Sequence, residues 1–126
     1  MVLQLRDDAN DLYQGIQNLA IISPHGHCDP MWFAENTAFS DPAELLVVPD
    51  HYVLRMLVSK GLTLSELGVQ PLDGSTFEKD PEKIWRRFSE NYYLFRGTPT
   101  AMWLDYSFEK VFGITELLTP ANSDFY

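Results

Sequence analysis

The chain has 126 residues, 45% apolar and 13% aromatic, which is enough for the core of one modest domain. Eighteen acidic and nine basic side chains give a formal charge of −9, which argues against nucleic acid and membrane surfaces as partners. Cys28 is the single cysteine, so it has no internal disulfide partner, and neither a signal peptide pattern nor a bilayer-spanning apolar run is present. We therefore expect a cytoplasmic protein.

The first expected elements are a helix and a short strand. Apolar residues recur at helical spacing over residues 8–18, which predicts an amphipathic helix. Residues 20–23 form an apolar, β-prone run that is typical of a buried strand in a parallel sheet. A single strand cannot satisfy its own edge hydrogen bonds, so this strand indicates the N-terminal portion of a larger fold.

Two histidines follow the expected strand in the segment His25-Gly26-His27. Residues two apart in an extended segment point the same way, so both imidazoles can reach one metal ion. Gly26 leaves room between them for a close approach. The alternative interpretation is that the two histidines only order a loop through hydrogen bonds.

The rest of the chain is expected to be helical. Aspartate or threonine followed by proline is typical of a helix start, and a glycine typically follows the helix end. Turn-forming residues make 69–79 a loop. The aromatic stripe from Trp85 to Phe95 is interpreted as helix core and not as a surface on which a sugar stacks. The expected helical ranges are 42–47, 51–60, a single turn at 63–68, 81–95 and 99–111.

Three sequence blocks, residues 22–30, 49–57 and 94–99, resemble the uronate isomerase family, also called glucuronate isomerase, of the metal-dependent amidohydrolase superfamily. The blocks occur in the family's order, and the resemblance covers essentially the whole chain. It implies an α/β fold, the N-terminal fragment of a (β/α)8 TIM barrel, mostly α-helical here with the first barrel strand. Residues 1–30 would hold the N-terminal helix, that strand and the metal-binding loop, and residues 31–126 a helical excursion. A complete barrel takes about 250 residues or more, so the remainder of the barrel is expected to be absent from this chain.

The resemblance assigns His25 and His27 to a divalent metal, expected to be zinc. In this superfamily later strands complete the metal site, so the metal would be incompletely liganded in this fragment. The implied reaction, in hexuronate catabolism, isomerises D-glucuronate to D-fructuronate and D-galacturonate to D-tagaturonate. The expected partner is thus a small hexuronate substrate, and the isolated chain is expected to be inactive.

The block at residues 49–57 matches the family's substrate pocket. Tyr52 is the candidate for proton transfer between C2 and C1 of the sugar, with His51 assisting or positioning, because both side chains donate and accept hydrogen bonds. Arg55 lies on the same helical face and suits the substrate carboxylate. The alternatives are that Tyr52 only packs at the helix start and that Arg55 pairs with Glu44 or Asp50.

Two other functions remain open. A hydrolase of the same superfamily would also use His25 and His27, with the metal activating water. A non-catalytic, truncated helical module would instead expose a large apolar patch where the barrel would lie, and would self-associate or form a homo-oligomer through it.

Overall fold

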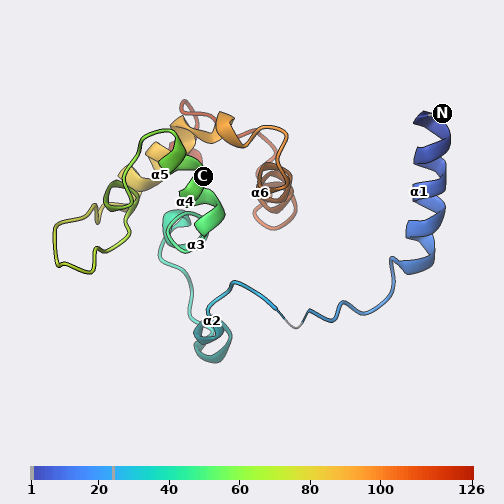
Figure 1. Ribbon diagram of the computed structural model, residues 1–126, viewed down its shortest axis with the longest axis horizontal. Coiled ribbons are helices and arrows are strands. Elements are labelled where there is room, and N and C mark those ends of the chain that lie inside the picture. Colours follow the sequence, from blue (N-terminus) through green and yellow to red (C-terminus); the bar gives the residue numbers. More distant parts are fainter. Residues whose placement is uncertain (1, 24) are drawn as a thin grey trace.

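The computed structural model describes residues 2–23 and 25–126, with side chains from residue 5 onward. Pro24, which directly precedes His25, lies outside the described residues. Over these residues the chain is helical (Figure 1). The elements in chain order are α1 (Val2–Ile16), α2 (Pro30–Glu35), α3 (Pro42–Leu46), α4 (His51–Ser59), the 3-10 helix η1 (Ser65–Leu67), α5 (Pro81–Glu90), η2 (Tyr92–Phe95), α6 (Pro99–Lys110) and η3 (Ser123–Phe125).

Side-chain caps explain where the helices begin. The side chains of Asp41, Asp50, Asp80 and Thr98 each accept a backbone N–H from the first turn of the helix that follows. The predicted starts of α3, α4, α5 and α6 are therefore confirmed. Asp29 caps α2 in the same way, with proline next, although no helix was expected there.

Two helix boundaries differ from the prediction by more than two residues. Helix α1 begins at Val2, six residues earlier than expected. Helix α5 ends at Glu90, because Asn91 leaves the helical conformation and its side-chain amide donates to the carbonyl of Arg87 at 2.8 Å. The chain then continues as the separate 3-10 helix η2, so the prediction of one continuous helix to residue 95 was wrong.

The strand expected over residues 20–23 is not formed in the described part of this chain. The described residues contain no strand, and this segment forms part of the connection between α1 and α2 (Figure 1). Ile21 and Ile22 are 94% and 89% exposed. A strand forms by exchanging backbone hydrogen bonds with a neighbour, and the described part of the chain offers no neighbouring strand.

The hydrophobic core lies between α3, α4, α5 and α6. Trp85, Phe88 and Phe95 are buried, which confirms the interpretation of their stripe as core, and Trp85 donates its indole N–H to the carbonyl of Ser123 at 2.9 Å. The largest fully buried apolar side chains are Val47, Val53, Leu57, Leu67, Phe88 and Phe95.

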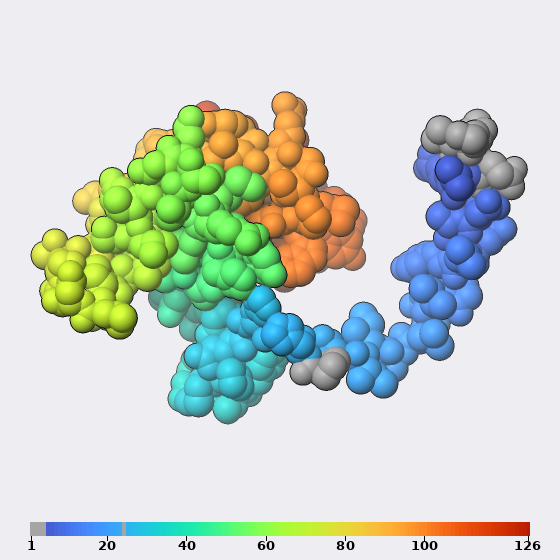
Figure 2. Space-filling model, in the orientation of Figure 1, coloured from blue at the N-terminus to red at the C-terminus, as the bar shows by residue number. Residues whose placement is uncertain are grey.

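Helix α1 stands apart from this helical body. An extended segment connects α1 to α2, and Figure 2 shows open space between α1 and the helical body. Its apolar residues Leu12 and Ile16 are exposed. No helix within the described residues combines the length and apolar character that crossing a membrane requires.

Gly68 provides a test of the packing beside α5. Its φ is +84°, and an added Cβ would lie 2.6 Å from Cδ1 of the buried Ile84. We expect Gly68→Ala to lower the free energy of unfolding by about 2–4 kcal/mol, measured by urea denaturation, from backbone strain plus overpacking. Gly74 is the control, because its φ is +76° but nothing lies within 4 Å of an added Cβ. Equal losses in the two variants would contradict the packing at Gly68.

Candidate functional site

His25 and His27 turn their side chains toward each other. Their Nε2 atoms lie 2.8 Å apart, and their rings meet nearly at right angles with centroids 4.8 Å apart. The hydroxyl of Ser23 donates to the carbonyl of His25 at 2.8 Å and so helps to order the loop. Two imidazole nitrogens that converge on one point form the donor pair expected for a metal ion, although 2.8 Å also suits a direct hydrogen bond between the rings.

Helix α4 brings a second pair of predicted residues to this loop. The ring of His51 stacks on His27 with centroids 4.8 Å apart, and the Tyr52 ring lies 5.8 Å from that of His27 at an interplanar angle of 12°. The ring centroids of His51 and Tyr52 are 4.2 Å apart. The Asp50 cap fixes the start of α4 by accepting the backbone N–H of Tyr52 at 2.8 Å. Side chains from two separate segments thus form one cluster of rings.

Arg55 lies one turn further along α4. Its Cζ atom sits over the Tyr52 ring, 5.0 Å from the centroid, in a cation–π contact. Within the described residues Arg55 forms no ion pair with Glu44 or Asp50, the partners of the alternative interpretation. Hydrogen bonds from Ser40 occupy the Glu44 carboxylate and hold its pKa below the usual range. The guanidinium therefore remains available to an anion beside the Tyr52 ring.

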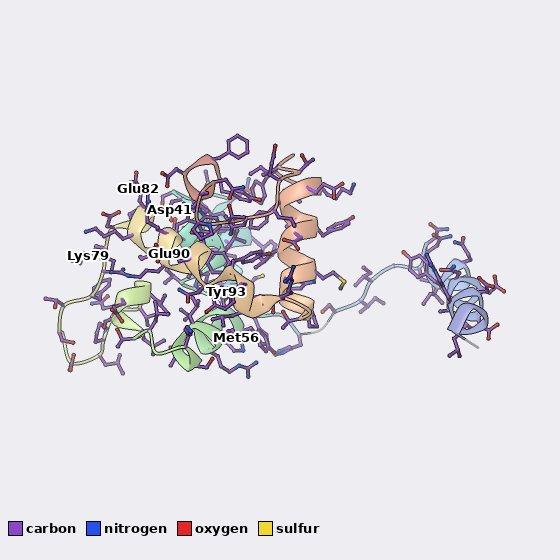
Figure 3. All side chains as sticks on the ribbon, turned by 90° about the horizontal axis from the view of Figure 1, so that it is seen from above. Asp41, Met56, Lys79, Glu82, Glu90 and Tyr93 are labelled. Carbon is purple, nitrogen blue, oxygen red and sulfur yellow. The ribbon has the colours of Figure 1, made fainter. Side chains whose placement is uncertain are left out.

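A groove of about 550 Å³ runs between α4 and the start of α6, and we call it the α4–α6 groove. Met56 of α4 lines it, and α4 contacts η2, the 3-10 helix that carries Tyr93; both residues are labelled in Figure 3. A separate, larger cavity of about 920 Å³ is lined by His27 and Cys28 among other residues. The side chains that define the groove include Tyr52, Arg55, Met56, Phe95, Pro99 and Trp103.

Tyr52 belongs to both parts of this site. Its ring stacks on His27 and lies tilted against His51, and the residue also lines the α4–α6 groove. A ligand in the groove would therefore meet Arg55 and Tyr52 together, beside the histidine pair. The sequence did not predict that α6 forms the opposite wall, because no spacing signal links residues so far apart in the chain.

A partly buried hydrogen bond joins α6, which forms the opposite wall of the groove, to η2. The hydroxyl of Tyr92 in η2 donates to a carboxylate oxygen of Asp105 in α6 at 2.7 Å. Burial raises the pKa of Tyr92, and the hydrogen bond and charge of Asp105 raise it further, so the hydroxyl stays protonated. This bond ties α6 to η2, and both of these elements contribute residues to the groove.

The donor set of this chain suits part of a metal site. Neutral imidazoles are good ligands for zinc, but zinc sites in proteins ordinarily have three or four protein ligands. Among the described residues no group of three or more histidine, cysteine, aspartate or glutamate side chains is placed to hold one ion. His25 and His27 thus fit a metal site as two of its ligands, and the exposed thiol of Cys28 does not complete it.

Comparisons with known proteins place this chain beside a group of sugar-acid isomerases. A family model described as glucuronate isomerase matches residues 1–125. The uronate isomerase of Rhizobium meliloti is 59% identical over 116 residues, which is 92% of this chain and 25% of that protein. The uronate isomerase of Mesorhizobium japonicum is 56% identical over 119 residues, covering 94% of this chain and 25% of that protein.

A solved structure shows the same arrangement of helices. The crystal structure of glucuronate isomerase from Caulobacter crescentus matches with a TM-score of 0.85 at 49% identity, over 96% of this chain and 25% of that chain. The present chain therefore spans about a quarter of the length of the curated relatives it matches.

Proposed function

The chain belongs to the glucuronate isomerase family, and we propose that it supplies the metal-binding histidines and the proton-transfer groups of a uronate isomerase. The proposed reaction interconverts D-glucuronate with D-fructuronate, and D-galacturonate with D-tagaturonate, in hexuronate catabolism in the cytoplasm. One observation carries the proposal: His27 of the loop and the His51–Tyr52 pair of α4 come together in one ring cluster.

The chemistry requires a group that can both take and give a proton. Isomerisation of an aldose to a ketose removes a proton from C2, passes through an enediol and delivers a proton to C1. The Tyr52 hydroxyl is the proposed carrier, and His51, with its ring centroid 4.2 Å from that of Tyr52, positions it or assists the transfer.

Arg55 is the proposed anchor of the substrate. Its guanidinium suits a bidentate contact with the C6 carboxylate of a uronate. Because Arg55 also contacts the Tyr52 ring, a carboxylate bound there would place the sugar beside the proton carrier. A divalent metal held by His25 and His27, with zinc the expected ion, would act as a Lewis acid toward a sugar oxygen.

The proposal extends to the fold of the whole protein. Residues 1–30 would provide the first strand of a (β/α)8 barrel and its metal loop, and residues 31–126 the helical excursion after it. In that setting residues 20–23 would find the neighbouring strands that the described chain does not offer. The open space between α1 and the body would then be filled by the rest of the barrel (Figure 2).

A chimera tests this function directly. Residues 1–126 replace the matching N-terminal quarter of the Caulobacter isomerase, giving what we call the chimeric isomerase. With zinc it should isomerise D-glucuronate and D-galacturonate at an ordinary enzymatic rate, roughly 1–10³ s⁻¹. The 126-residue chain alone, with stoichiometric zinc, should show no turnover, because its described residues bring no more than two candidate metal ligands together.

Two results would contradict the proposal. The first is a chimeric isomerase that folds, as judged by circular dichroism, and binds zinc, but acts on neither uronate. The second is clear turnover by the 126-residue chain alone, because the site would then be complete without later strands.

A further inference from the structure

Trp103 presents its indole to the α4–α6 groove from the first turns of α6. It is 66% exposed, whereas Leu104 and Phe108 on the same helix are buried in the core. A large aromatic side chain that lines a groove without joining the core has surface free for a ligand. The core contacts of α6 therefore do not require an indole at this position.

We propose that Trp103 is a specificity-determining residue of the uronate site, whose indole packs against the apolar face of the sugar ring. This inference rests on the proposed function and adds a wall to the site that the sequence did not reveal. Trp103 faces a groove shared with Tyr52 and Arg55, so the sugar would lie between the indole and α4.

The charged residues that line the α4–α6 groove favour a hexuronate as its ligand. Arg55 is the one cation among the described residues that line it, in a chain with a formal charge of −9. Asp50 also lines the groove, but its carboxylate accepts the backbone N–H groups of Tyr52 and Val53 at the start of α4. A ligand with one carboxylate, several hydroxyls and an apolar ring face matches a groove with one guanidinium, a phenol and an indole.

The groove is also of suitable size and character. Its volume of about 550 Å³ falls within the range of small-molecule sites, and Met56, Phe95 and Pro99 provide apolar surface around the polar groups. An apolar ligand would gain nothing from Arg55, and an anionic ligand without a ring face would gain nothing from Trp103. A hexuronate uses both.

The test compares Trp103→Ala with Trp103→Phe in the chimeric isomerase. Losing the stacking surface should raise KM for D-glucuronate roughly tenfold with kcat nearly unchanged, because the contact is the same in ground state and transition state. Trp103→Phe should restore most of the affinity. Tyr106→Ala is the matched control, since Tyr106 is 64% exposed on the same helix and does not line the groove.

A binding measurement separates this inference from the proposed function. D-glucuronate should change the tryptophan fluorescence of the chimeric isomerase, and Trp103→Phe should abolish that change, whereas D-glucose, which lacks the carboxylate, should cause little. If turnover is absent but this signal is present, the proposed function fails and the Trp103 site stands. If the chimeric isomerase does not fold, the same fluorescence titration with D-glucuronate is done on the 126-residue chain, and its result decides whether Trp103 contacts the sugar.

Two outcomes overturn the role of Trp103. An unchanged KM in Trp103→Ala, with the fluorescence response retained in Trp103→Phe, means that the indole does not touch the sugar. A lower melting temperature and lower kcat with KM unchanged means that Trp103 packs under the remaining part of the enzyme.

Discussion

Replacing Tyr52 with phenylalanine in the chimeric isomerase should lower kcat by about 10²–10⁴-fold and leave the fold intact. The change removes only the hydroxyl that we propose carries the proton between C2 and C1. The ring would keep its contacts with His27, His51 and Arg55, so the cluster should hold its shape. Steady-state kinetics measures the loss, and circular dichroism checks the fold.

The matched control for this variant is Tyr93→Phe. Tyr93 is an exposed tyrosine of η2 that does not line the α4–α6 groove. It should retain normal turnover. Near-normal activity of Tyr52→Phe would remove Tyr52 from proton transfer and leave it as an aromatic residue that packs at the start of α4.

Replacing His27 with alanine should cost the chimeric isomerase both its metal and its activity. His27 provides one of the two converging imidazole nitrogens, and its ring also stacks on His51. We expect zinc affinity to fall by more than roughly 100-fold, since loss of a direct ligand exceeds the effect of its supporting groups. Zinc content after dialysis and turnover of D-glucuronate provide the two measurements.

Cys28→Ser is the control for the histidine variant. Cys28 follows His27 directly and its thiol is free and exposed. If the metal uses the histidines and not the thiol, this variant should keep zinc and turnover. A His27→Ala variant that holds stoichiometric zinc, or a Cys28→Ser variant that loses it, would contradict the assignment of the metal ligands.

Local signals predicted the helix starts well. Asp41, Asp50, Asp80 and Thr98 are capping residues that act on the next few amides, so their effect is visible within one turn of sequence. Asp29 is a cap of the same kind at the start of α2, a helix that was not predicted although its signal is equally local.

Signals that depend on distant partners predicted less. The strand over residues 20–23 carries the right composition, but a strand needs a neighbour, and the described chain has none for it. The end of α5 depends on the side chain of Asn91, which competes for a helix carbonyl in a way that periodicity does not show. Hydrophobic spacing across residues 81–95 therefore suggested one helix where the structure has two.

In the candidate site, too, local signals predicted more than signals that depend on distant partners. Individual residues of the histidine loop and of α4 could be proposed from the sequence, since the family resemblance marks them. Their stacking, and the wall that α6 adds with Trp103, result from tertiary contacts between separate segments. Such contacts are set by packing of the core, and no local pattern encodes them.

The most direct measurement is the position of zinc in crystals of the chimeric isomerase, located by anomalous scattering at the zinc edge. Our account predicts one strong peak at roughly 2.0–2.1 Å from both Nε2 atoms of His25 and His27, beside the rings of His51 and Tyr52 that contact His27. A peak bound elsewhere, or histidines that pair with each other and leave the metal to other residues, would contradict it.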